Sequence, residues 1–271
     1  MMESYTEIEE VKSYLIQKGI PSKAEAVIIL GSGLGSFSES INKPIRIPYQ
    51  QIPNFPSTSV QGHTGELVSG EVAGKKVLAF SGRFHFYEGH SFSKTVLPVR
   101  LVKAFNADKL IISNAAGAIN TDFQIGDLMV IDDLIRPFHS ISVDPSTTFR
   151  YNLYPFTERA YKIATEVGLD VRKGSYVYVK GPNYETKAEI IAFRVLGGDV
   201  VGMSTSPELI EACKLKIPAV AISLVTNMAA GVQKGKLDHA EVKIAAESRK
   251  EDFAKLVIEL IKKNCNHNRL F

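Results

Sequence analysis

Segments that are rich in β-branched residues alternate with segments of helical periodicity along this chain, and this alternation most constrains its fold. Short apolar runs between glycines and prolines predict strands at residues 26–30, 66–72, 75–80, 109–113, 128–135, 175–180 and 219–225. Periodic segments predict helices at residues 4–18, 94–106, 157–168, 187–197, 207–216 and 239–263. Two stretches, 44–56 and 136–156, are expected to be long loops. The pattern predicts an α/β fold with one domain over residues 1–271.

Capping signals mark three of the expected helix starts. They are Thr186 with Glu189, Asp238 with Glu241, and Ser206 followed by Pro207. The first two pairs have the spacing of a capping box, in which two side chains satisfy each other's backbone N–H groups. Serine before proline is a preferred combination of N-cap and first helical residue.

Bulk composition excludes several classes of function. The net charge is only +3 and no run of five basic residues occurs, so nucleic acid is not an expected partner. Cys213 and Cys265 lie far apart and match neither a metal nor a redox spacing. The acidic, amphipathic N-terminus is unlike a secretory signal, and no apolar run approaches the roughly 20 residues of a membrane helix. We expect a cytoplasmic protein without membrane contact.

The stretch VIILGSGLGSF at residues 27–37 resembles a phosphate-binding loop but departs from the dinucleotide fingerprint. Ser36 occupies the third glycine position, and no acidic strand end follows about 20 residues later. An NAD-dependent oxidoreductase is therefore disfavoured. Ser32 also lacks the G-x-S-x-G context of an acyl-transfer nucleophile.

Small polar residues follow several of the expected strands. Ser32, Ala115, Glu185 and Ser204 are all expected at such carboxyl ends. Ligands of α/β sheets bind there, because helix N-termini offer free N–H groups to anions. A single glycine-serine turn is more often only structural, so it is the recurrence that favours an anion site.

Arg83 and His85 supply candidate cationic groups for that site. They are two residues apart, so in an extended segment they project from one face. Arginine can fork onto phosphate oxygens, and histidine can donate to them. The alternative is a surface arginine with a structurally satisfied histidine. A metal site is not expected, because the six histidines show no H-x-x-x-H spacing and no cysteine partner.

Taken together, the motifs resemble those of a known family. They are GSGLG (31–35), IPNFP (52–56), GHTGEL (62–67), GRFHFYEGH (82–90), NAAGAIN (114–120), GPNYET (181–186), VVGMS (200–204) and VTNMA (225–229). In this order they are similar to trimeric purine nucleoside phosphorylases, over about residues 20–240. The resemblance implies a mixed β-sheet flanked by helices and a homotrimer. It implies phosphorolysis of purine ribonucleosides and deoxyribonucleosides, chiefly inosine and guanosine, in purine salvage. Inorganic phosphate would be the co-substrate, with no metal and no organic cofactor.

The same resemblance implies a role for each residue that matches a family motif. Phosphate would be bound by Ser32, His63, Arg83, His85, Ala115 and Ser204. The purine would be bound by Glu185, Asn227, Tyr184 and Met203, and the ribose by Tyr87, Met203, His239 and Tyr154. His85, Glu185 and Asn227 would act in catalysis. The segment before His239 is shorter here than in mammalian relatives, and Tyr154 is preferred to Phe156 as the aromatic that reaches a neighbouring subunit.

Other functions remain open from the sequence. A 6-aminopurine or methylthioadenosine phosphorylase would share the fold and most of these motifs. A non-enzymatic nucleoside-binding protein would lack the anion-binding set of Arg83, His85 and Ser204, all of which are present.

Overall fold

A computed structural model describes residues 2–56, 64–137, 154–233 and 239–263. Within these ranges, only the backbone is described for residues 2–5, 154–155, 239–243 and 245–246. The strands are β1 Ala26–Leu30, β2 Asn42–Pro48, β3 Glu66–Val72, β4 Lys75–Ser81, β5 Leu110–Ala118, β6 Leu128–Ile135, β7 Arg172–Tyr178, β8 Val200–Gly202 and β9 Ala219–Met228. The helices are α1 Met2–Gln17, α2 Phe92–Thr95, α3 Leu97–Ala104, α4 Tyr154–Glu166, α5 Lys187–Val195, α6 Ser206–Lys214 and α7 His239–Lys262. Short 3₁₀ turns cover Gly35–Ser40, Tyr49–Gln51 and Phe86–Glu88.

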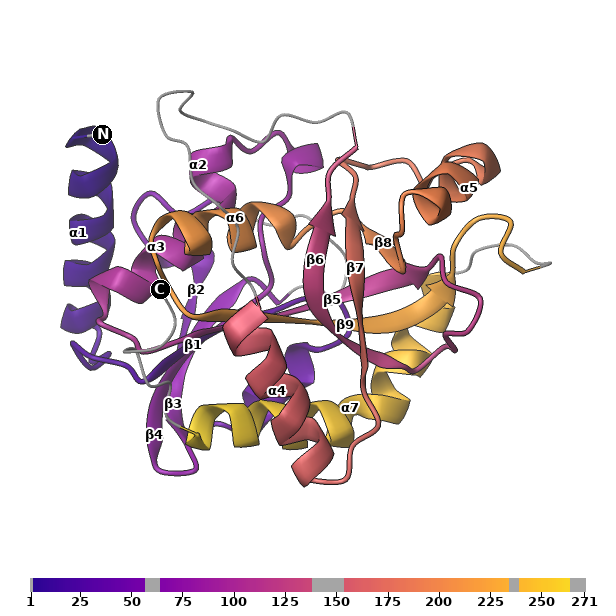
Figure 1. Cartoon of the computed structure of the whole chain (residues 1–271). Coiled ribbons are helices and arrows are strands. Elements are labelled where there is room, and N and C mark those ends of the chain that lie inside the picture. Colours follow the sequence, from indigo (N-terminus) through magenta and orange to yellow (C-terminus); the bar gives the residue numbers. More distant parts are fainter. Residues whose placement is uncertain (1, 57–63, 138–153, 234–238, 264–271) are drawn as a thin grey trace.

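All the described strands belong to one mixed sheet in the order β2-β3-β4-β1-β5-β8-β7-β6-β9 (Figure 1). β5 also pairs with β9, so β5, β8, β7, β6 and β9 close into a ring, from which β1, β4, β3 and β2 extend. β1 is parallel to β4 and β5, whereas β8 runs antiparallel to β5. The mixed sheet confirms the expected α/β class.

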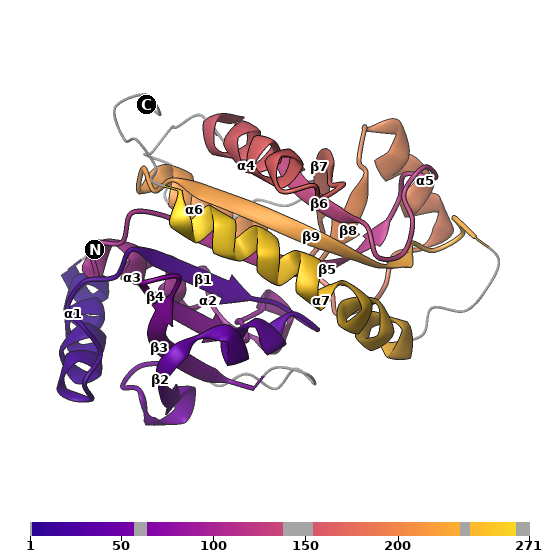
Figure 2. The ribbon, with the colours of Figure 1, turned by 90° about the horizontal axis from the view of Figure 1, so that it is seen from below.

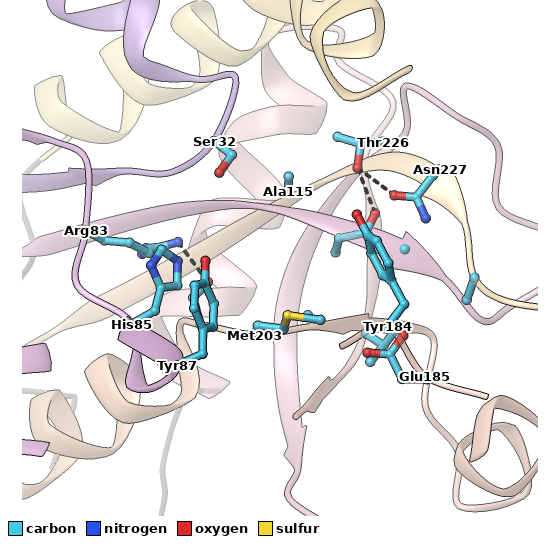
Figure 3. A pocket seen from close by; sticks show the side chains of 16 residues that line it. Ser32, Arg83, His85, Tyr87, Ala115, Tyr184, Glu185, Met203, Thr226 and Asn227 are labelled. Carbon is cyan, nitrogen blue, oxygen red and sulfur yellow. Dashed lines mark hydrogen bonds between the residues drawn. The ribbon is translucent and has the colours of Figure 1, made fainter. Parts of the chain in front are cut away.

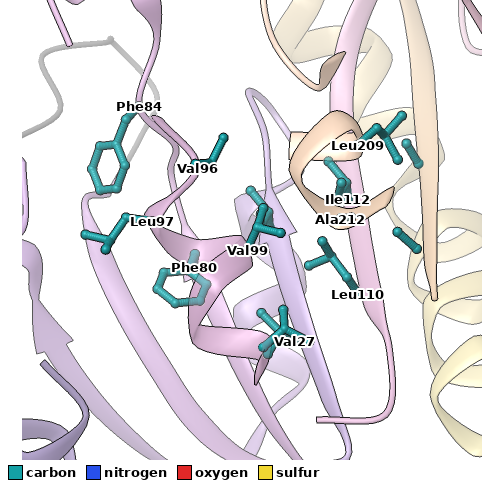
Figure 4. Packing of buried hydrophobic residues seen from close by; sticks show 14 of the residues in the cluster. Val27, Phe80, Phe84, Val96, Leu97, Val99, Leu110, Ile112, Leu209 and Ala212 are labelled. Carbon is teal, nitrogen blue, oxygen red and sulfur yellow. The ribbon is translucent and has the colours of Figure 1, made fainter. Parts of the chain in front are cut away.

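Helices cover both faces of this sheet. Alternate residues of β1 enter different cores, because successive side chains of a strand point to opposite faces. Val27 and Ile29 pack in the cluster that includes residues of α1, α3 and α6, part of which Figure 4 shows. Ile28 and Leu30 pack in the cluster that includes α4 and α7. Figure 2 shows α7 lying along β9 on this second face.

The expected loop at 44–56 is wrong over its first part, because residues 42–48 form β2. Pro44 and Pro48 made a strand unexpected, because proline has no backbone N–H to donate to a neighbouring strand. β2 is an edge strand that pairs only with β3 in the described structure, and edges tolerate proline. The three-residue β8 was also missed, because so short a run carries no periodicity.

The expected helix at 94–106 is divided into α2 and α3 at Val96, where ψ is 7°. Pro98 lies in the first turn of α3, a position where its missing N–H costs nothing. Thr205, rather than Ser206, is the N-cap of α6. The capping box of Thr186 and Glu189 is confirmed at α5, whereas Asp238 lies outside the described residues.

Candidate active site

A pocket of about 790 Å³, solvent space at its mouth included, opens where β5, β8 and β9 meet. Its lining includes all the predicted site residues except His63, Tyr154 and His239. Figure 3 shows Ser32, Arg83 and His85 at one end, and Tyr184, Glu185 and Asn227 at the other. His63 lies outside the described residues, as do the side chains of Tyr154 and His239, the first residues of α4 and α7.

Ala115 lies inside β5 and not beyond its end, which corrects the sequence expectation. On one edge β5 pairs with β1 up to Ile112 and with β8 from Gly117, so no described strand covers that edge between them. The Ser113 carbonyl faces this gap, where it accepts a bond of 2.9 Å from Arg83. The N–H and C=O of one strand residue point to the same edge, and those of every second residue do likewise, so the Ala115 N–H also faces the gap. A break in the ladder thus exposes a backbone donor to the pocket.

Arg83 is buried to 2% exposure and is bound to a carboxylate. Its Nε and Nη2 donate to the two Glu208 carboxylate oxygens at 3.2 and 3.0 Å. Its Nη1 donates to Ser204 Oγ at 3.0 Å as well as to Ser113. The sequence predicted that the guanidinium fork would face phosphate, but in this structure the fork faces Glu208. Arg83 therefore holds the Ser204 hydroxyl from inside the protein.

His85 is oriented by Glu88 three residues later. The Glu88 carboxylate accepts from the His85 backbone N–H at 2.9 Å and lies 3.0 Å from Nδ1. A carboxylate can only accept, so Nδ1 carries the proton of this contact. Burial lowers the pKa of His85, the Glu88 contact opposes this, and the Arg83 charge lowers it further. The Tyr87 ring stacks on His85 at 4.6 Å, and burial raises the pKa of Tyr87 to about 12, so its phenol keeps its proton.

The opposite end of the pocket combines a carboxylate with an amide. Burial raises the pKa of Glu185, the backbone hydrogen bond opposes this, and the Glu189 charge adds to the rise. Asn227 Oδ1 accepts from the Thr226 hydroxyl at 3.0 Å, and Nδ2 donates to the Met228 carbonyl at 3.2 Å. These bonds fix which side of the amide faces which neighbour. Tyr184 is 55% exposed at the mouth.

Sequence reasoning missed several residues around the pocket. Thr226 lines it beside Asn227, while Glu88 and Glu208 position the cationic groups. Glu88 could have been found from its spacing after His85. The pairing of Arg83 with Glu208 spans 125 residues, and no local signal reveals it.

Close packing explains two glycines near the site. A Cβ on Gly31 would lie 2.5 Å from the Ser113 carbonyl oxygen, and one on Gly202 would lie 2.3 Å from the Tyr176 hydroxyl. Each glycine permits an approach of two chain segments that a side chain would prevent.

The phosphorylase superfamily matches residues 25–262 of this chain. The chain belongs to this superfamily. Purine nucleoside phosphorylase 1 of Geobacillus stearothermophilus is 42% identical, over 95% of this chain and 97% of that protein. The purine nucleoside phosphorylase of Schistosoma mansoni in complex with adenosine is 37% identical and superposes with a TM-score of 0.86, over 94% of this chain and 96% of that one. The same organism's enzyme in complex with inosine is 35% identical, also with a TM-score of 0.86, over 96% of this chain and 97% of that one. The family resemblance read from the motifs is confirmed.

The described residues of this phosphorylase superfamily member contain no group of three or more His, Cys, Asp or Glu side chains suited to a metal ion. Within the same part of the chain, no helix has the length and apolar character needed to cross a membrane.

Proposed function

We propose that this protein cleaves purine ribonucleosides and deoxyribonucleosides with inorganic phosphate. The products are the free purine and α-ribose or α-deoxyribose 1-phosphate, and inosine and guanosine are the chief substrates. The observation that carries the proposal is one pocket with an anion-binding set at one end and a carboxylate–amide pair at the other. The purine nucleoside phosphorylases similar to this chain support it.

Phosphate binds at the end formed by Ser32, Arg83, His85, Ala115 and Ser204. The serine hydroxyls and the Ala115 N–H donate to its oxygens, and the buried Arg83 charge lies directly behind Ser204. His85 donates to phosphate from Nε2 only as the imidazolium, because Nδ1–H is directed at Glu88. Dianion binding therefore raises the pKa of His85 from its lowered value.

The purine binds between Glu185 and Asn227. An ionised Glu185 accepts from the N1–H of hypoxanthine, and from N1–H and the 2-amino group of guanine. The Asn227 amide bonds the 6-oxygen and N7. Adenine has a bare lone pair at N1, which would face the carboxylate.

The bond from C1′ of the sugar to N9 of the purine breaks with its electron pair leaving on the purine. The sugar then has oxocarbenium character, and a phosphate oxygen forms the new bond to C1′. Phosphate held beneath the ribose stabilises this cation and is already in line for attack. Asn227 stabilises the charge that builds on the base. Tyr87 and Met203 contact the ribose between the two ends.

The finer properties belong to the same proposal. We infer a single domain over residues 1–271, a homotrimer in the cytoplasm, and a role in purine salvage. The reaction uses neither metal nor organic cofactor, and no nucleic acid or membrane takes part. His63 closes over phosphate, and Tyr154 and His239 reach the ribose.

Purified protein should release hypoxanthine from inosine only when phosphate is added, and adenosine should turn over far more slowly. A site built on paired donors and acceptors can reject a mismatched analogue by up to ~10⁴-fold. The measurement is kcat/KM for inosine, guanosine and adenosine, with and without phosphate.

Phosphate-independent release would contradict phosphorolysis. Equal kcat/KM for adenosine and inosine would instead favour the 6-aminopurine alternative. The similar Schistosoma mansoni structure is a complex with adenosine. Turnover of adenosine, rather than its binding, is therefore the decisive quantity.

A further inference from the structure

The chain makes a strained turn at Thr205, between Ser204 and the start of α6. Thr205 has φ 70° and ψ −48°, and the Ser206 N–H donates to the Ser204 carbonyl at 2.7 Å. These angles and this bond across one residue define a γ-turn of the rare, positive-φ kind. A β-branched residue is especially disfavoured there, so the surrounding structure must hold the turn in place.

The turn brings residues on both sides of Thr205 to one guanidinium group. Ser204 Oγ, just before the turn, and the Glu208 carboxylate, in the first turn of α6, both accept from Arg83. Tyr176 adds a further constraint, because its hydroxyl accepts from the Ser204 N–H at 3.3 Å. The placement of Ser204 and Glu208 around Arg83 therefore depends on the conformation of Thr205.

The Thr205 side chain is used to hold the turn and not to cap the helix. Its hydroxyl makes no capping bond to α6, although Thr205 is the N-cap residue. It accepts instead from Asn114 Nδ2 at 3.0 Å and lies 3.3 Å from Ser204 Oγ. Asn114 and Thr205 are each 1% exposed, so these bonds are made away from water. Asn114 lies on β5 between Ser113, which binds Arg83, and Ala115, which lines the pocket.

We propose that Thr205, held in its γ-turn by Asn114, is a positioning residue that sets Ser204 and Arg83 for phosphate binding. The proposal rests on the phosphorolysis proposed above and extends it to residues that do not contact phosphate. Loss of the hydrogen bond between Asn114 and the Thr205 hydroxyl would let Ser204 rotate away from the pocket. The resulting loss would fall on phosphate and not on nucleoside, because Glu185 and Asn227 lie at the other end of the pocket.

The test compares Thr205→Val and Thr205→Ser with the wild-type enzyme. Valine keeps the β-branched shape but removes the hydroxyl, and we expect the KM for phosphate to rise roughly tenfold, as for loss of one buried hydrogen bond. The KM for inosine should change less than about twofold. Thr205→Ser restores the hydroxyl and should restore the phosphate KM.

Thr157→Val is the matched control for a purely structural loss. Thr157 is also 1% exposed, and its hydroxyl donates to the Ile131 carbonyl at 3.0 Å, outside the pocket lining. This variant should lower Tm and leave the phosphate KM unchanged. If Thr205→Val likewise lowers only Tm, or raises both KM values equally, Thr205 is not a positioning residue.

Thr205→Gly covers the case in which valine prevents folding. Glycine adopts positive φ without strain, so this variant should fold, yet it lacks the hydroxyl and should still show the raised phosphate KM. An unchanged phosphate KM in Thr205→Gly would overturn the proposal. Absence of phosphate-dependent cleavage in the wild-type enzyme would instead overturn phosphorolysis itself, so the two failures are distinguishable.

Discussion

Individual carboxylates in this protein do different work because their surroundings differ. Glu208 is 3% exposed and faces the Arg83 guanidinium, whereas Glu185 lines the pocket with no described ion pair. Glu88 orients His85, and Glu189 caps α5 at its exposed start. Arg83→Ala would leave Glu208 buried without its counter-ion, so this substitution tests stability together with phosphate binding. Ser204→Ala probes phosphate contact more directly.

The raised pKa of Glu185 predicts a pH dependence. Glu185 accepts from purine N1–H only when it is ionised. Burial raises the pKa of its carboxyl group above the ordinary value of 4.5. We expect kcat/KM for inosine to be at its plateau value at neutral pH and to fall as the pH decreases through this raised pKa. The profile should be measured at saturating phosphate.

Glu185→Gln should lower kcat/KM at neutral pH and remove this acid limb. Glu189→Gln is the control. Its side chain is not part of the pocket lining, so the acid limb should remain, moved slightly to lower pH because the Glu189 charge contributes to the raised pKa of Glu185. An acid limb that persists unchanged in Glu185→Gln would assign it to another group.

At the scale of elements, Lys109 joins the end of α7 to the start of β5. Its buried Nζ donates to the carbonyls of Leu260, Ile261 and Lys263, at 3.0, 3.3 and 2.5 Å. The last carbonyls of a helix have no intrahelical partner, and a cation at this end also interacts favourably with the helix dipole. One side chain thus fixes α7 against the sheet.

Lys109→Met should lower the free energy of unfolding by about 2 kcal/mol, because buried carbonyls lose a charged donor. Urea unfolding of the purified protein measures the change. Lys255→Met is the control, since exposed Lys255 donates to the Val167 carbonyl at 2.7 Å and its loss should cost less than about 0.5 kcal/mol. Equal effects of the two substitutions would show that Lys109 contributes no more than a surface lysine.

At the scale of the whole molecule, the exposed face of α5 supports the proposed homotrimer. Ile191 and Val195 of α5 and its C-cap residue Leu196 are 60%, 84% and 57% exposed, and they follow Tyr184 and Glu185 of the pocket in the sequence. Exposed apolar patches commonly mark protein–protein interfaces.

Chains of two inactive variants should complement each other if Tyr154 serves a neighbour's site. In mixed assemblies, a site on a Tyr154→Ala chain keeps its own Glu185. It receives an intact Tyr154 from a neighbouring Glu185→Ala chain. We expect activity above that of either variant alone, measured after subunit exchange is confirmed by mass. Activity that only dilutes linearly would refute the assignment of Tyr154.

Local patterns in the sequence determined the α/β class and most strands and helices. The capping box at Thr186 and the apolar stripe that buries Phe253, Leu256, Val257 and Leu260 depend only on neighbours along the chain. The motif order added the family and, through it, the site residues.

Tertiary structure alone decided how these residues are held. β5 continues to Ala118 through the small residues of NAAGA because β9 pairs along its whole length, and the gap opposite exposes Ala115. β2 forms despite its two prolines because it lies at the edge of the sheet. Arg83 faces Glu208, and Thr205 is held in a positive-φ turn by Asn114, 91 residues away. Such contacts depend on which strands become neighbours, and short-range periodicity carries no information about that.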